Sequence, residues 1–283
     1  QSMSLPTQIQ VYGGNHSPWV QAVLLGVYER QIPHIVRTVP PLSLFLHSGI
    51  MMPAAKFDQA PWALDSGRIL ESLGFEDGSQ ADKEALNRVF MNGARERTES
   101  IWKFWYSWSH LREHSPSVLG RLWGHLRRTF SVFYFFTILT LLRRRLSQRS
   151  ASQLATQFSY WEERLATGSP FLGGDSPQII DLQLFGQVQM FASIPGPSLA
   201  VLKDAPDLDC LRAWISRMQT RFEGYEHLYS APFFEPRGME PEKAPRFERA
   251  FYWLSCLCIW LVFPITLAVT LFYVARVNRL NLR

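Results

Sequence analysis

One stretch of the sequence constrains everything else, because no charged residue occurs between Arg249 and Arg276. As an α-helix, the 26 residues 250–275 would be about 39 Å long. The hydrocarbon core of a bilayer is roughly 30 Å thick. Tyr252 and Tyr273 lie near the two ends of the stretch, where amphipathic rings favour the headgroup region. The stretch therefore predicts a membrane-spanning helix, and the alternative is a buried core helix of a soluble domain.

The sequence shows no apolar N-terminal signal segment, so we expect the span to be inserted last, as a C-terminal tail anchor. The N-terminal domains then face the cytoplasm. Three cysteines cannot form a disulfide framework, which agrees with folding in a reducing compartment. The net charge of +5 comes from clusters of arginine, so the expected partner is membrane lipid and not nucleic acid.

Ahead of the span, the hydrophobic periodicity changes from strand-like to helical. It predicts a strand at residues 8–12, a helix that begins at Ser17-Pro18, and a second strand at residues 34–39. Asp65-Ser66-Gly67 is interpreted as the turn of a hairpin between strands at residues 62–64 and 68–70. From about residue 81 onward the pattern is helical.

This order predicts an α+β fold in several parts. They are a tag remnant (1–3), a small α/β domain (4–78), an all-helical domain (79–230), a proline-rich linker (231–249), the membrane helix (250–275) and a short basic tail (276–283).

Four segments in this order carry a resemblance to a known family. They are IQVYGGNHSPWVQAVLLGVYERQIPH, QAPWALDSGRILES, SPFLGGDSPQIIDLQLF and DLDCLRAWISRM. Together they resemble the cytosolic glutathione transferase superfamily over about residues 9–225. The resemblance implies a thioredoxin-like N-terminal domain, an all-α C-terminal domain and glutathione as co-substrate.

A glutathione transferase must lower the pKa of a thiol that is mostly protonated at neutral pH. Ser17 is predicted at the N-cap of the first helix, where its hydroxyl can donate to a sulfur and the helix dipole favours negative charge. The resemblance points to the same residue as the catalytic serine of Ser-type members. Two alternatives remain at this point: Ser17 is a helix cap only, or Tyr12 is the hydroxyl donor.

The resemblance also implies a binding site for glutathione. Pro61 stands where the family has a cis-proline, and the backbone of Ala60 before it would pair with the cysteinyl part of the ligand. Glu71 and Ser72 stand where the family holds the γ-glutamyl end, and Gln59 stands where some members contact the glycyl carboxylate. All five residues are expected to share one cleft with Ser17.

Two further patterns need an interpretation. His110-Leu-Arg-Glu-His114 has the spacing of a zinc-peptidase motif, but Pro116 follows at once, so we interpret it as a solvated helix end and expect no metal. Residues 129–142 are uncharged and lie between arginine clusters. They are too few to span a bilayer, so they form core, a homodimer interface or an in-plane membrane contact.

Two functions are consistent with these features. The first is a membrane-anchored glutathione transferase that conjugates glutathione to apolar electrophiles partitioned into the bilayer. The second is a non-catalytic adaptor at a membrane, similar to metaxins or to the ganglioside-induced differentiation-associated protein, which join this fold to a C-terminal membrane segment.

Overall fold

A computed structural model of the chain describes residues 6–14, 17–99, 101–110, 115, 117–142, 151–192, 196–229 and 244–281. The chain divides into two compact units. The first unit combines residues 1–90 and 149–234, and the second combines residues 91–148 and 235–283. The predicted tag remnant and most of the predicted linker lie outside the described residues.

The first unit contains a four-stranded sheet in the order β2-β1-β3-β4. Strands β1 and β2 are parallel, while β3 is antiparallel to both β1 and β4. The elements follow one another as β1 (Ile9–Tyr12), α1 (Pro18–Glu29), β2 (His34–Arg37), α2 (Leu42–Ser48), β3 (Ala54–Phe57), β4 (Trp62–Leu64) and α3 (Ser66–Ser72).

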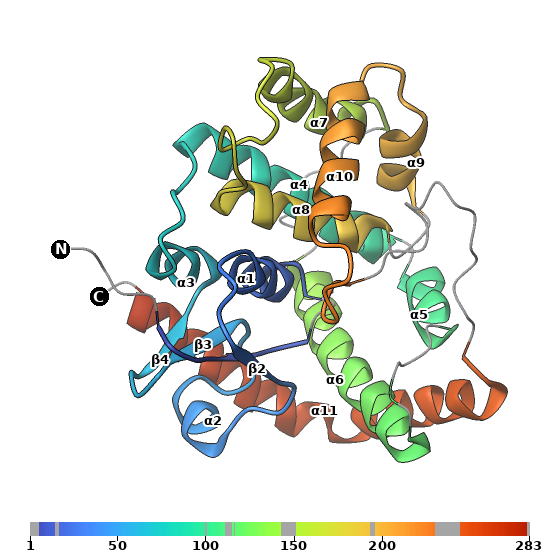
Figure 1. Ribbon diagram of the computed structural model, residues 1–283. Helices are drawn as coiled ribbons and strands as arrows, with labels where there is room; N and C mark the ends of the chain where they lie inside the picture. The colour runs from blue at the N-terminus through green and yellow to red at the C-terminus, as the bar shows by residue number, and fades with distance from the viewer. Residues whose placement is uncertain are drawn as a thin grey trace. The chain divides into compact units, whose positions relative to one another are not determined.

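The alternation of side chains along β1 determines which helices cover which face of the sheet. Ile9 and Val11 are buried in the core with apolar residues of α1 and α3. Tyr12 points to the other face, where it packs with Leu44 of α2 and with Ala54. Helices α1 and α3 therefore lie on one side of the sheet and α2 on the other (Figure 1).

The predicted hairpin is wrong, because residues 68–70 belong to helix α3. The side chain of Asp65 accepts a hydrogen bond from the backbone N–H of Arg68, which caps the helix at its first turn. The partner of β4 is instead β3, a strand that the sequence pattern did not indicate.

The first unit also contains helices α7 (Ala151–Leu165), α8 (Ile179–Ala192), α9 (Pro197–Asp204) and α10 (Asp209–Arg221), together with the start of α4 (Gln80–Glu99). Trp161, Phe185 and Trp214 are fully buried among them. The carboxylate of Asp181 accepts four hydrogen bonds, from the backbone N–H groups of Leu172, Gly173 and Gln178 and from the indole of Trp214. The predicted α+β class with a helical second part is confirmed.

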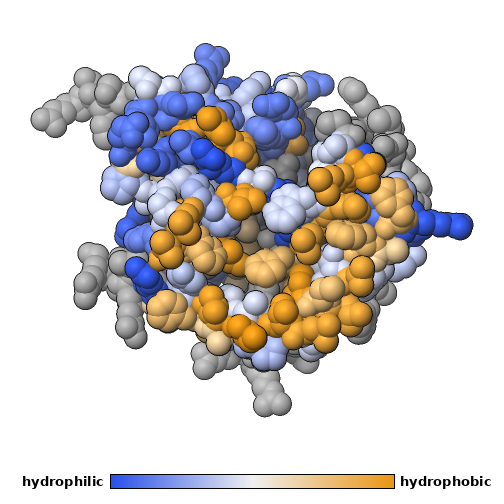
Figure 2. Space-filling view, turned by 90° about the horizontal axis from the view of Figure 1, so that it is seen from below, coloured by the Kyte–Doolittle hydropathy of each residue, from blue (hydrophilic) through white to orange (hydrophobic). Residues whose placement is uncertain are grey.

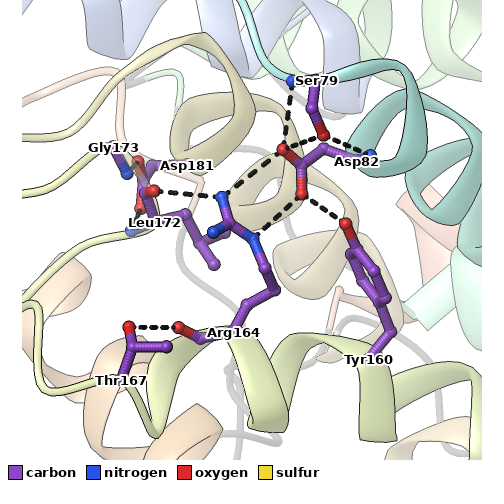
Figure 3. A network of polar contacts seen from close by, with 8 residues as sticks. All are labelled: Ser79, Asp82, Tyr160, Arg164, Thr167, Leu172, Gly173 and Asp181. Carbon is purple, nitrogen blue, oxygen red and sulfur yellow. Dashed lines mark hydrogen bonds and ion pairs between the residues drawn. The ribbon is translucent and has the colours of Figure 1, made fainter.

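A second buried carboxylate connects α4 to α7 (Figure 3). Asp82 accepts hydrogen bonds from the backbone N–H and the hydroxyl of Ser79, and from the hydroxyl of Tyr160 at 2.7 Å. Arg164 pairs with the same carboxylate at 3.2 Å. Burial alone would raise the pKa of Asp82, but these donors and the Arg164 charge outweigh it and hold the pKa below its ordinary value.

The second unit is formed by the end of α4 with helices α5 (Ile101–His110), α6 (Val118–Leu142) and α11 (Arg246–Asn281). Arg121 and His125 of α6 contact Glu248 of α11, and further along Phe133 of α6 packs against Trp260 and Phe263. Since both sequence numbers rise together along the contact, α6 and α11 run parallel. Within the described side chains, the apolar part of α6 thus packs against α11.

Helix α11 buries one stripe and exposes the opposite face. Tyr252, Cys256 and Ile259 are buried, whereas Leu261 and Ile265 are 75 % and 72 % exposed. Figure 2 shows apolar side chains gathered on the face seen from below, where α6 and α11 run. Among the described residues, α11 is the one helix long and apolar enough to cross a membrane.

Candidate functional site

The strand register brings three loops together at one end of the sheet. Tyr12 at the end of β1 is paired with Ala54 at the start of β3, and Ala54 is paired with Leu64 at the end of β4. The segments that adjoin these three residues are therefore neighbours. They are Gly13-Gly14 after β1, Met52-Pro53 before β3 and Asp65-Ser66 after β4.

Gly13 is required where β1 approaches α1. Its φ of 147° is in a region that side-chain-bearing residues rarely adopt. An added Cβ would lie 2.4 Å from Cγ2 of Val20 on α1. This close approach keeps the first turn of α1 at the end of the sheet.

Ser17 is the N-cap residue of α1, as the sequence predicts. Its backbone N–H donates to the carbonyl of Gly14 at 2.9 Å, and Pro18 occupies the first helical position. Its side chain makes no capping hydrogen bond and is half-buried. Ser17 is thus the N-cap residue by its position, while its hydroxyl makes no capping hydrogen bond at this helix N-terminus.

The cis peptide bond joins Met52 to Pro53, so the expectation of a cis-proline at Pro61 is wrong. The side chain of Met52 reaches the end of β1, where its Sδ accepts the N–H of Gly14 at 3.5 Å. Among the hydrogen bonds of the described residues, none involves the backbone N–H or C=O of Met52. Met52 thus presents unpaired backbone groups close to the start of α1.

Asp65 and Ser66 form an acidic residue–serine pair at the junction of β4 and α3. Asp65 is exposed and has a φ of 76°, an uncommon conformation for a residue other than glycine. Ser66 is buried, and its hydroxyl accepts a hydrogen bond from the amide of Gln183 on α8 at 3.0 Å. Strained backbone of this kind is often found at functional sites.

Tyr12 is only 4 % exposed and faces α2, on the side of the sheet opposite to α1. Its hydroxyl donates to the carbonyl of Ile50 at 3.4 Å. This geometry favours Ser17 over Tyr12 as the hydroxyl near the start of α1.

The other predicted site residues do not share a cleft with Ser17. Gln59, Ala60 and Pro61 are exposed and lie between β3 and β4, at the opposite end of the sheet. The Ala60 N–H already donates to the carbonyl of Phe57 at 2.8 Å, so it is not free for a ligand.

Glu71 and Ser72 are exposed at the C-terminal end of α3. The hydroxyl of Ser72 donates to the carbonyl of Arg68 on the same helix. A helix C-terminus carries partial negative charge, which disfavours the carboxylate of a γ-glutamyl group there. The sequence analysis did not name Met52, Pro53, Asp65 and Ser66 as candidates, because strand β3 was not indicated and residues 68–70 of α3 were interpreted as a strand.

No group of three or more histidine, cysteine, aspartate or glutamate residues that could hold a metal ion occurs in the described part of the chain. Of the zinc-peptidase spacing, His110 is described and contacts Arg249, while residues 111–114 lie outside the described residues.

Comparison with protein families finds that residues 144–217 match the C-terminal domain of glutathione S-transferases. The match covers helices α7, α8 and α9 and most of α10, and it confirms the resemblance to this superfamily for these helices. A comparison with curated proteins finds no match.

Among solved structures, a theta class glutathione S-transferase of Xanthomonas axonopodis pv. citri with bound glutathione has 16% identity and a TM-score of 0.42, covering 77% of this chain and 94% of its own. A glutathione transferase of Bombyx mori has 15% identity and a TM-score of 0.45, with coverages of 80% and 95%. Glutaredoxin 2 of Salmonella typhimurium in complex with glutathione has 12% identity and the same TM-score, with coverages of 78% and 96%. Likenesses at this level carry no argument about activity.

Proposed function

We propose that this chain, whose helical domain matches the C-terminal domain family of glutathione S-transferases, binds glutathione at the end of the sheet beside α1. The observation that carries the proposal is the Ser17 hydroxyl, which is not engaged in capping although it sits at the N-terminus of a 12-residue helix. A hydroxyl donor and the positive end of a helix dipole both favour a thiolate. They would lower the pKa of the glutathione thiol from its ordinary value of about 8.5.

The neighbouring segments supply complementary groups for the rest of the ligand. Glutathione is a peptide, and the unpaired backbone N–H and C=O of Met52 can pair with its backbone as a strand edge does. The exposed carboxylate of Asp65 carries a charge opposite to that of the γ-glutamyl amino group. These two segments and Ser17 replace the residues that the sequence resemblance had suggested.

We also propose that α11 attaches the protein to a lipid bilayer. Its exposed face carries large apolar side chains, and α6 exposes Leu119 and Trp123 in its first turns, beside the start of α11. Exposed tryptophan and leucine side chains beside the start of an apolar helix suit the boundary between lipid headgroups and acyl chains. A glutathione site on a membrane-bound protein would meet apolar electrophiles that partition into lipid, and the proposed reaction is their conjugation.

A non-catalytic adaptor is the second candidate, and two contacts favour it. The Met52 sulfur already accepts the Gly14 N–H next to Ser17, and the Ser66 hydroxyl is already engaged by Gln183. If these contacts persist, they occupy groups that a ligand would use, and the fold serves as a scaffold.

Retention of the detergent-solubilised full chain on immobilised glutathione separates the two candidates. A glutathione-binding protein is retained and then eluted by free glutathione, whereas an adaptor passes through. Passage of the protein at neutral pH and low salt would reject the glutathione site.

For the conjugating activity, we predict that Ser17→Ala lowers kcat/KM with chlorodinitrobenzene by about 10²-fold, because it removes a hydrogen bond to the developing thiolate. The affinity for glutathione, measured by calorimetry, should change little. Ser72→Ala is the matched control, since that hydroxyl bonds only within α3. Equal rates for the wild type and Ser17→Ala would remove Ser17 from the mechanism.

A further inference from the structure

The first turn of α11 is held to α5 and α6 by a set of buried and part-buried polar contacts in the second unit. The Glu248 side chain is fully buried, and its carboxylate accepts hydrogen bonds from Arg121 Nε at 2.6 Å and from His125 Nε2 at 2.9 Å. The neighbouring Arg249 reaches His110 at the end of α5. Two of these three contacts to α11 involve a histidine.

The partners of His125 define its protonation state. Arg128 Nη2 lies 2.7 Å from His125 Nδ1, and a guanidinium can only donate, so Nδ1 is the acceptor and carries no proton. The single ring proton is therefore on Nε2, which donates it to Glu248. His125 is neutral, and its ring is fully buried between Arg128 and Glu248.

The same reasoning applies to His110, but here Nδ1 is the donor and Nε2 is the acceptor. Its Nδ1 lies 2.8 Å from the carbonyl of Tyr106, which can only accept, so Nδ1 carries the proton. Its Nε2 accepts from Arg249 Nη1 at 2.6 Å. The backbone of His110 adds another contact, because its carbonyl accepts the N–H of Ala244 just before α11.

We propose that these contacts form a histidine clasp, defined as His110–Arg249 and Arg128–His125–Glu248, which holds α11 against α5 and α6 and opens in mild acid. A second proton on either ring would remove the acceptor of an arginine hydrogen bond. It would also place two cations at hydrogen-bond distance, in a buried site at His125 and in a part-buried one at His110, where like charges are costly.

The charged and titratable groups around the clasp support the proposal that protonation opens it. His125 is faced by Arg121 and Arg128 from α6 and by Glu248 and Tyr252 from α11. Glu248 contacts both His125 and Arg121, so its single negative charge serves two donors. His110 is faced by Tyr106 on α5 and by Arg249.

This clasp goes beyond the proposed function, because it acts between α11 and the helices that hold it and does not require glutathione. When it opens, the buried stripe of α11 that contains Tyr252, Cys256 and Ile259 is released from α6. The inference therefore predicts that the attachment of the apolar helix responds to pH.

The test measures the distance between α6 and α11 by pulsed electron paramagnetic resonance in phosphatidylcholine nanodiscs. Spin labels are introduced as unnatural amino acids at Leu119 and Leu254 of the full chain, both of which are exposed, so that the native cysteines stay in place. We expect a narrow distance distribution at pH 7.5 and a broader, longer one at pH 5.0. An unchanged distribution in the wild type would overturn the proposal without any variant.

The double variant His110→Gln and His125→Gln keeps a hydrogen-bond acceptor at each position but removes the titration. It should show the narrow distribution at both pH values. His47→Gln, on an exposed histidine of α2 in the first unit, is the matched control and should still open in acid. Opening of the double variant at pH 5.0 would overturn the proposal, because the change would then come from other groups.

Discussion

Gln187 on α8 carries a buried amide whose nitrogen and oxygen both lack a hydrogen-bond partner in the described structure. A buried polar group without a partner costs about 1–3 kcal/mol. We predict that Gln187→Leu, which replaces the amide by an apolar group of similar size, raises the free energy of unfolding by an amount in this range. Urea denaturation of the detergent-solubilised protein measures the change.

Gln183, one helical turn earlier, is the matched control for this substitution. Its amide donates to the Ser66 hydroxyl at 3.0 Å, so Gln183→Leu should lower the stability. A loss of stability in both variants would mean that the Gln187 amide is satisfied in solution.

Among single residues, the sequence identified Ser17 correctly as the N-cap but missed the cis-proline. Pro53 and Pro61 both stand just before a strand, so the local sequence favours neither. The difference lies in the pairing of Tyr12 with Ala54, a contact between segments far apart in the sequence. Periodicity within one segment carries no information about such a pairing.

At the scale of elements, strands β1, β2 and β4 and helices α1, α7 and α10 lie where the sequence pattern predicts them, whereas β3 was not indicated and residues 68–70 of α3 were interpreted as a strand. β3 has only four residues and shows no clear alternation. The pairing of α6 with α11 was also missed, because the uncharged segments 129–142 and 250–275 give no sign of their partners. The structure shows that α11 is a neighbour of this segment of α6, since Phe133 packs against Trp260 and Phe263. The composition of residues 129–142 could not identify that neighbour.

The Asp82 carboxylate, which connects α4 to α7, gives a prediction about how the stability of the protein depends on pH. The pKa of Asp82 is lowered in the folded state, so its contribution to stability is present above the ordinary value of 3.8 and is lost as the pH falls through the lower folded value. Asp82→Asn should therefore lower the free energy of unfolding at pH 7 by about 1–3 kcal/mol. The difference from the wild type should shrink below about pH 4.

Asp77→Asn is the control for this prediction, because Asp77 pairs with Lys83 at the surface and surface pairs contribute about 0–1 kcal/mol. Thermal unfolding of both variants between pH 3 and pH 7 makes the comparison. An Asp82→Asn variant with the same pH dependence as the wild type would contradict the assignment.

At the scale of the whole molecule, the proposed membrane attachment can be tested by placing one charged residue in the candidate span. Leu261 lies near the middle of the candidate span and is 75 % exposed. A charged residue at the centre of a spanning helix costs about 2.5–3.5 kcal/mol. We predict that Leu261→Asp moves most of the protein from the carbonate-resistant membrane fraction to the soluble or aggregated fraction.

Leu119→Asp is the matched control, because Leu119 is equally exposed but lies in the first turn of α6. It should leave the protein in the carbonate-resistant fraction. If Leu261→Asp behaves in the same way, α11 does not cross the bilayer and attaches by another geometry.

The second unit is built from two segments that are far apart in the sequence, residues 91–148 and 235–283, and this affects how the chain folds during synthesis. Arg121 and Glu248 are 127 residues apart in the sequence. At about 5–20 residues per second, a ribosome takes about 6–25 s to make the residues between them. During that time α6 has been made but α11 has not, so the surface of α6 that packs against α11 is uncovered. We expect a nascent chain of this kind to be prone to aggregation through α6 until α11 leaves the ribosome.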